Sequence, residues 1–104
     1  MAAYLVVDIT HIHDERSYAL YRSQVSPGLE AAGGTYLARG GSVEVLEGEW
    51  SPGRVVIVRF DSIEAAHRWW KSPDYESLKR LRQTSTSTNM ILVAGTPERD
   101  EVQR

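Results

Sequence analysis

Apolar positions follow two different periods along this chain, and the periods predict its elements. Residues 4–11, 54–60 and 89–94 are rich in β-branched and other apolar residues, which favour strands. Elsewhere, apolar residues recur at steps of three and four, as they do on one face of a helix. We predict strands at 4–11, 35–39, 54–60 and 89–94, a helix that begins at Asp14, and a helical region that begins near residue 62.

The first helix has a clear start and end in the sequence. Asp14 can act as its N-cap, and Gly33 can end it in the left-handed conformation. Pro27 lies within this segment, so we expect a kink there, or a restart with Ser26 as the cap. One helical face is predicted to carry Tyr18, Tyr21, Val25, Leu29 and Ala32.

The second helical region is predicted to consist of two parts. Asp61 or Ser62 can cap the first part, and Asp61 with Glu64 resembles a capping box. The second part is predicted to begin with Ser72 as its N-cap and Pro73 in its first turn. In the first part, Ile63, Ala66 and Trp70 share one helical face. The helical spacing continues in the second part with Tyr75, Leu78, Leu81 and Arg82.

Two glycine pairs bracket the short strand at 35–39 and make residues 33–50 a candidate pocket wall. Glycine adopts positive φ angles without steric cost, so both pairs predict turns. Residues 42–50 are predicted either as the first half of the next strand or as a separate hairpin arm, followed by a turn at 51–53. The block carries polar and aromatic side chains at Arg39, Glu44, Glu47, Glu49 and Trp50.

The predicted order is β-α-β-β-β-α-α-β, which without the extra arm is the split βαβ, ferredoxin-like plan of an α+β protein. Both helical regions then cover one face of an antiparallel sheet. The other face would hold Val6 and alternate residues of 54–60 and 89–94, and no further segment could cover it. An uncovered apolar face favours a partner sheet, so we predict a two-fold homodimer.

Length and composition exclude several classes of protein. The 104 residues suit one domain, predicted at 1–95, with a frayed charged tail at 96–104. A net charge of −2 argues against nucleic acid and against anionic membranes as partners. The absence of cysteine excludes disulfides and thiolate chemistry, and no apolar run is long enough to span a membrane. We therefore expect a cytoplasmic protein.

Four segments, taken in order, resemble a known family: RGG at 39–41, LEG at 46–48, RVVIVRF at 54–60 and SPDYESLKRLR at 72–82. They are similar to the domain-of-unknown-function family numbered 1330, and the similarity covers about residues 3–95. The resemblance implies a dimeric α/β barrel. The wider superfamily includes cofactor-independent monooxygenases, muconolactone isomerases, haem-degrading enzymes and dehalogenase-like proteins. Position 59, often acidic or apolar in such sequences, is Arg59 here.

Asp8 stands in the middle of an apolar strand, where an unpaired carboxylate is costly to bury. The first and third strands of a split βαβ sheet are neighbours, so Asp8 is predicted to face Arg59. The pair could be an ion pair in the dimer interface. Alternatively, Asp8 could be a pocket acid or base tuned by burial, or it could simply be exposed.

His11 and His13 are two residues apart and share one side of an extended strand. Such a pair can supply two metal ligands, but no third ligand is evident nearby. His11 could instead be a general base at a pocket mouth, or both could be surface residues. We expect no cofactor, and no phosphate-binding glycine loop occurs.

The remaining candidates are aromatic and basic. The space between helices and sheet could be lined by Tyr18, Tyr21, Arg22, Trp69, Trp70 and Tyr75, or these could be core residues. Arg39 is the best candidate for holding a carboxylate or enolate oxygen, unless it pairs with Glu44 or Glu47. A solvated face is predicted for His67, Arg68, Lys71, Lys79, Arg80 and Arg82.

These considerations give two functional hypotheses. In the first, the protein is a cofactor-independent isomerase, lyase or monooxygenase-like enzyme that acts on a small aromatic or acidic compound. Its catalytic residues would be Asp8, His11 and Arg39, and its ligand-binding residues Tyr18, Tyr21, Glu44, Arg59, Trp70 and Tyr75. In the second, it is a non-catalytic dimer that binds a small molecule or supports an assembly.

Overall fold

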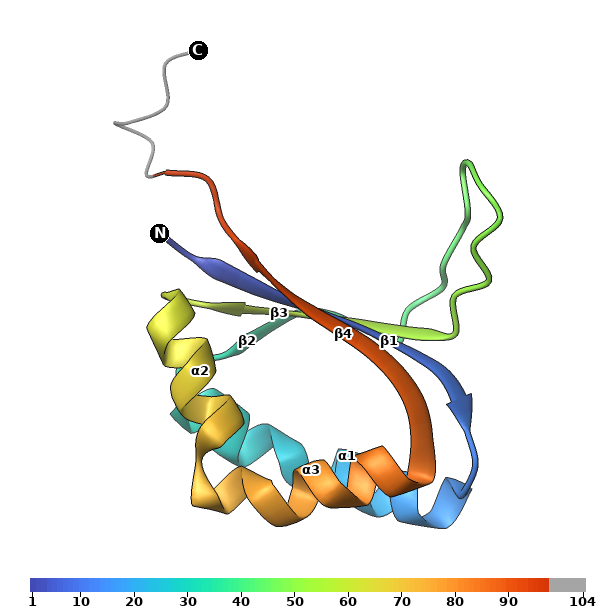
Figure 1. Cartoon of the computed structure of the whole chain (residues 1–104), viewed down its shortest axis with the longest axis horizontal. Coiled ribbons are helices and arrows are strands. Elements are labelled where there is room, and N and C mark those ends of the chain that lie inside the picture. The colour runs from blue at the N-terminus through green and yellow to red at the C-terminus, as the bar shows by residue number, and fades with distance from the viewer. Residues whose placement is uncertain (98–104) are drawn as a thin grey trace.

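The computed structural model describes residues 1–97, and over this range a four-stranded antiparallel sheet carries three helices on one face (Figure 1). The sheet order is β2-β3-β1-β4, so the first strand lies in the centre. The predicted α+β, ferredoxin-like plan is confirmed, and the predicted tail lies outside the described residues from position 98 onward. The elements are β1 (Ala3–Ile12), α1 (Glu15–Ala31), β2 (Thr35–Arg39), β3 (Arg54–Phe60), α2 (Ile63–Lys71), α3 (Pro73–Ser85) and β4 (Thr86–Ala94).

Capping groups decide where the helices begin. The Asp14 side chain accepts a hydrogen bond from the Ser17 backbone N–H at 3.1 Å, which confirms the predicted N-cap of α1. The predicted restart at Ser26 is wrong, because α1 continues through Pro27 to Ala31. Gly33 follows with a φ of 94°, as predicted for a helix end.

Helices α2 and α3 meet at Ser72. This residue ends α2 and caps α3, and Pro73 occupies the first turn, as the sequence predicts. The predicted capping box of Asp61 and Glu64 is wrong: Ser62 is the N-cap of α2, and its Oγ accepts from the Ala65 N–H at 3.0 Å.

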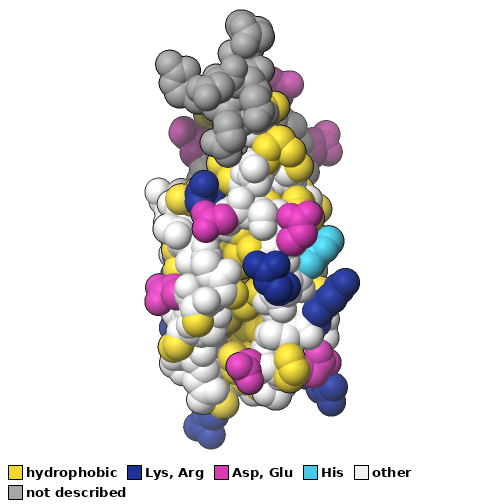
Figure 2. Space-filling view, turned by 90° about the vertical axis from the view of Figure 1, so that its left-hand side faces the viewer, with side chains coloured by type: hydrophobic (Ala, Val, Ile, Leu, Met, Phe, Trp, Pro, Cys, Tyr) yellow, Lys and Arg dark blue, Asp and Glu magenta, His cyan; other side chains and the backbone are white. Residues whose placement is uncertain are grey.

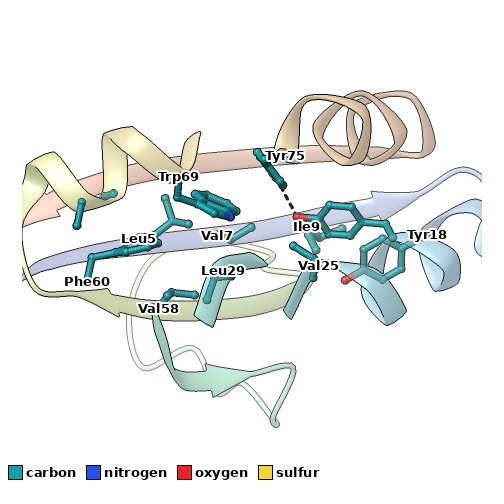
Figure 3. Packing of buried hydrophobic residues seen from close by; sticks show 13 residues of the cluster. Leu5, Val7, Ile9, Tyr18, Val25, Leu29, Val58, Phe60, Trp69 and Tyr75 are labelled. Atoms are coloured by element: carbon teal, nitrogen blue, oxygen red, sulfur yellow. Dashed lines mark hydrogen bonds between the residues drawn. The ribbon is translucent and has the colours of Figure 1, made fainter. Parts of the chain in front are cut away.

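Strand register assigns each side chain to one of the two sheet faces. Leu5 pairs with Val58, and Val7 pairs with Val56, on the face beneath the helices. Val58 and Phe60 are 1% and 0% exposed there. The helices add Tyr18, Val25, Leu29, Trp69 and Tyr75 to the same core (Figure 3).

The opposite face, called the open face below, is apolar over its central strands. Val6 pairs with Ile57 on one side and with Ile91 on the other. Ile91 is 59% exposed and Val93 is 43% exposed. No segment within residues 1–97 covers this face with a second layer (Figure 1).

Residues 40–53, called the arm below, connect β2 to β3 without regular structure. The strand predicted at 42–50 is therefore wrong. The arm projects from the sheet on the side opposite the helices (Figure 1). It exposes four apolar side chains, those of Val43, Val45, Leu46 and Trp50.

Charged side chains are dispersed over the end of the molecule drawn in Figure 2. Basic side chains lie among acidic ones there, and hydrophobic side chains are visible between them. Opposite charges at such short range partly cancel one another's long-range fields. Within residues 1–97, no helix is both long and apolar enough to cross a membrane.

Candidate functional site

A cavity of about 40 Å³ lies between the sheet, α1 and α3. Its floor comes from the helix-facing side of β1 and β3, and its sides come from the helices and β2. The lining comprises Leu5, Val7, Ile9, Tyr18, Tyr21, Arg22, Val25, Leu29, Tyr36, Arg39, Arg54, Val56, Val58, Trp69, Arg82 and Met90.

Arg22, Arg39, Arg54 and Arg82 all line this cavity, and the lining includes no carboxylate and no histidine. They come from four different elements: α1, β2, β3 and α3. Among residues 1–97, none of the four forms an ion pair with an acidic side chain. The cavity is therefore a place where positive charge gathers without a protein counter-charge.

Arg82 is the most deeply buried of the four, at 4% exposed. Its Nε donates to the Tyr75 Oη at 3.4 Å, and that hydroxyl also bonds the Tyr21 hydroxyl at 2.9 Å. Figure 3 shows this link between Tyr75 on α3 and α1 as a dashed line. Within residues 1–97 the terminal nitrogens of the guanidinium have no hydrogen-bond partner. These nitrogens can therefore donate hydrogen bonds to a ligand.

Burial raises the pKa of the Tyr21 hydroxyl, and the neighbouring Tyr75 adds to the rise, while Arg82 opposes it. A raised pKa keeps this hydroxyl protonated at neutral pH. Tyr21 is thus a hydrogen-bond donor in this site, and its raised pKa makes it a poor general acid and, as a neutral hydroxyl, a poor general base.

Arg54 lies at the first position of β3, on the same face as Ile9, its partner across the sheet. Its Nε is buried and has no hydrogen-bond partner. The guanidinium lies against Gly40, where an added Cβ would clash with it. Gly40 also has a φ of 75°, which glycine adopts without strain. A glycine at this position therefore allows the turn and leaves room for the Arg54 side chain.

Arg22 and Arg39 are exposed and mark the mouth of the cavity. The Arg39 Nη2 donates to the Arg22 carbonyl oxygen at 3.2 Å, which ties β2 to α1. Each guanidinium also lies over a tyrosine ring: Arg39 over Tyr36 at 4.3 Å, and Arg22 over Tyr18 at 5.7 Å. Arg39 forms no ion pair with Glu44 or Glu47.

The structure brings together some of the predicted site residues. Tyr18, Tyr21 and Arg39 line the cavity, and Tyr75 joins it through Tyr21 and Arg82. Trp69 is the inward-facing member of the tryptophan pair, at 5% exposed, and Trp70 lies outside this cavity.

Asp8 lies on the open face, away from the cavity. Its predicted pairing with Arg59 is wrong, because Asp8 lies opposite Val55 and Asn89, whereas Arg59 lies opposite Tyr4. The Asp8 carboxylate instead accepts from the Trp50 Nε1 at 3.0 Å and from the Gly53 N–H at 2.8 Å. Asp8 therefore fixes the base of the arm.

The other predicted residues are also apart from the cavity. His11 is exposed, and the arm residue Glu44 is exposed as well. Arg59 forms an ion pair with Asp61 at 2.8 Å, and that hydrogen bond raises the Arg59 pKa. His11 and His13 lie with ring centroids 4.7 Å apart, but no group of three or more metal-ligating side chains occurs within residues 1–97.

Two cavity arginines are missing from the set predicted from sequence. Arg82 was expected on a solvated face, and that expectation is wrong because the residue is buried. Arg82 lies seven residues after Tyr75, so both are on one helical face, and this spacing could have indicated that Arg82 points toward the core. Arg54 is two, four and six residues before Val56, Val58 and Phe60, so strand alternation already assigns it to the covered face.

A comparison with protein-family models matches residues 2–96 to the family described as Domain of unknown function (DUF1330). The chain belongs to this family. No curated protein matches the sequence.

Solved structures similar to this DUF1330 chain support the fold. A protein of unknown function from Rhodopseudomonas palustris, RPA0582, is 18% identical with a TM-score of 0.76, over 92% of this chain and 83% of that one. SnoaB from Streptomyces nogalater, a cofactor-independent oxygenase, is 11% identical with a TM-score of 0.66, over 96% of this chain and 98% of that one. At such identities the likeness shows the ferredoxin-like fold alone.

Proposed function

We propose that this protein binds a small organic acid in the arginine-lined cavity. The observation that carries the proposal is the charge of the lining: four guanidinium groups and no carboxylate. Arg82 is buried and Arg54 is half-buried, and a buried charge without a counter-charge is costly, so this pair favours an anion as the missing partner. A carboxylate suits the planar fork of a guanidinium.

The residues have distinct expected roles. Arg82 and Arg54 would hold the carboxylate, because both are unpaired and face the cavity. Tyr75 and Tyr21 would position Arg82. Arg22 and Arg39, at the mouth, would attract the anion from solvent. The size of about 40 Å³ suits a carboxylate head group, so a larger ligand would extend beyond this cavity.

Titration calorimetry with acetate and benzoate, in a buffer free of other carboxylates, tests this function. Replacing Arg82 or Arg54 by methionine removes a charged hydrogen bond worth about 1.5–3 kcal/mol, so affinity is expected to fall roughly 10- to 100-fold. The ligand-free variants should stay folded, because no ion pair is broken and Arg82→Met loses only the long hydrogen bond to Tyr75.

Arg80→Met is the matched control for these variants. Arg80 is exposed on the same helix and pairs with Glu76 at 3.3 Å, and its loss should leave affinity unchanged. Equal affinity in all three variants, or no binding of either acid by the wild type, would refute the proposed site.

A catalytic role is the second candidate function, and the Tyr21–Tyr75–Arg82 chain favours it. A guanidinium at a substrate oxygen stabilises a developing enolate, and a neutral tyrosine hydroxyl can donate a hydrogen bond to it. Isomerase, lyase and monooxygenase-like reactions without a cofactor all pass through such charge development. The fold also occurs in SnoaB, a cofactor-independent oxygenase, although that likeness extends to the fold alone.

Exchange of hydrogen for deuterium at the carbon next to the carboxylate of a bound acid tests catalysis without knowledge of the natural substrate. Exchange that stops in Arg82→Met but continues in Arg80→Met supports an enzyme. Tight binding with no exchange across a panel of aryl and keto acids supports the non-catalytic alternative.

The homodimer predicted from the sequence also remains a proposal. Its support is the apolar open face, on which Ile91 and Val93 are exposed. Sedimentation at micromolar concentration tests it, and a species of 11.7 kDa would refute it.

A further inference from the structure

A second hollow runs along β4, which is an edge strand of the sheet. It consists of two adjoining pockets, of about 210 and 290 Å³, which share Trp70 and Met90. We call the two together the edge groove. Its lining comprises Leu5, Ala66, His67, Trp69, Trp70, Arg82, Gln83, Thr86, Thr88, Met90, Ile91 and Leu92.

The two ends of the edge groove differ in chemistry. The larger share of the first pocket is apolar, with Trp70, Ile91 and Leu92 among its walls. The second pocket is polar and is lined by Arg82, Gln83 and two threonines. A ligand that matches both ends has an apolar tail and a polar or anionic head.

Arg82 connects the edge groove to the arginine-lined cavity, since it lines both. Trp69 and Met90 also line both the cavity and the groove. A carboxylate bound to the buried Arg82 would therefore have the apolar part of the groove within reach of its tail. The groove supplies the room that the cavity of about 40 Å³ lacks.

The Trp70 side chain lines the groove and is fixed by contacts with its neighbours. The Lys79 ammonium lies over the Trp70 ring at 4.1 Å, and the ring also packs near Tyr75, with centroids 6.0 Å apart. The indole is thus held in place by contacts on α3 while it borders both pockets. A preformed aromatic wall of this kind favours an apolar ligand.

We propose that the ligand of this protein is an amphipathic monocarboxylic acid whose carboxylate binds Arg82 and whose hydrocarbon tail lies in the edge groove against Trp70. The inference rests on the proposed function, because it assigns the head group to the same arginine. It goes further by naming the class of ligand and the path of its tail.

Affinity for a series of unbranched acids tests the tail separately from the head. Acetate, butyrate, hexanoate and octanoate are titrated into the wild type, and the affinity is expected to rise about threefold for each added methylene until the groove is filled. Affinity that is equal along the series, with acetate still bound, overturns the amphipathic ligand but leaves the proposed function intact. No binding of any acid overturns both.

Two tryptophan variants locate the tail. In Trp70→Ala the rise with chain length should be largely lost, while acetate binds as in the wild type. Trp50→Ala is the matched control, because Trp50 borders a different apolar pocket on the open face, together with Val6 and Ile91. A rise that survives in Trp70→Ala but disappears in Trp50→Ala places the tail on the open face and overturns the proposal.

Methyl NMR of the wild type keeps the proposal testable if Trp70→Ala does not fold. Octanoate, but not acetate, should shift the Leu92 methyl signals, because Leu92 lines the groove and not the cavity. The Val6 methyls, which lie on the open face, should stay unchanged. Shifts at Val6 without shifts at Leu92 would contradict the proposed path.

Discussion

The two faces of this sheet differ in where they place charged and apolar side chains. The covered face carries Val58 at 1% exposed, yet it also turns Arg54 toward a cavity that contains three further arginines. The open face carries Ile91 at 59% exposed and, within residues 1–97, holds a single buried carboxylate, that of Asp8. The covered face thus combines an apolar core with a cluster of arginines, whereas apolar side chains are exposed on the open face.

This difference indicates what each face is suited to bind. Charged groups in a closed space cost free energy that a small anion can offset, so the covered face suits a ligand. Apolar residues in the open cost free energy that a second apolar surface can offset, so the open face suits a macromolecular partner. The same strands, through alternation of their side chains, serve both purposes.

The largest expected effect comes from adjacent substitutions on the two faces. Val58→Asp places a charge in the core, and we expect a loss of more than about 4 kcal/mol of folding free energy, which abolishes the fold. Ile57→Asp lies one residue earlier, on the open face, and should leave a folded protein with weakened self-association. Urea denaturation and sedimentation measure the two effects.

An equal loss of folding free energy in Val58→Asp and Ile57→Asp would contradict the proposed difference between the faces. It would mean that the open face is as essential to the fold of the single chain as the covered face. A folded Ile57→Asp protein that still sediments as a dimer would instead remove the open face as the contact surface.

A smaller effect is expected at Asp8, whose carboxylate is buried on the open face. Asp8→Ala removes the hydrogen bonds from Trp50 and Gly53, and we expect a loss of about 2 kcal/mol together with faster proteolytic cleavage within the arm. Asp61→Ala is the control: its exposed pair with Arg59 should contribute less than about 1 kcal/mol. Unchanged cleavage of the arm in Asp8→Ala would show that these bonds do not hold it.

Much of the fold follows from the sequence because local periodicity and topology agree. The apolar run at 54–60 indicates a strand, and the three-and-four spacing from Tyr18 to Leu29 indicates a helix and its buried face. The arm was mispredicted for a definable reason. Its Val43–Glu44–Val45 alternation is typical of a strand, but the segment pairs with none of the four strands of the sheet.

The site was harder to predict than the fold, because it depends on side chains that local patterns assign to solvent. An arginine at the start of a strand or on a charged helix is normally exposed. The spacing from Tyr75 places Arg82 on the same helical face, but the packing of α3 on α1 is what buries it. Asp8 attracted attention as a carboxylate in an apolar strand. Its actual partners, Trp50 and Gly53, lie more than 40 positions away in the arm, where no local pattern could identify them.

The smallest expected effect is at Tyr21, and it tests whether the covered face excludes water from the cavity. Tyr21→Phe removes the hydroxyl that bonds Tyr75, at an expected cost of about 1 kcal/mol near neutral pH. Burial raises the folded-state pKa of Tyr21 above the unfolded value of about 10. The stability that this shift represents is therefore complete below pH 10 and is lost as the pH rises above it, because only the unfolded chain then releases the proton. Urea titrations at about pH 8 and pH 11 should show the wild type losing about 1 kcal/mol more than Tyr21→Phe over this interval. Equal losses would mean that water reaches the Tyr21 hydroxyl, and the cavity would then be an open surface hollow in which an unpaired Arg82 needs no anion.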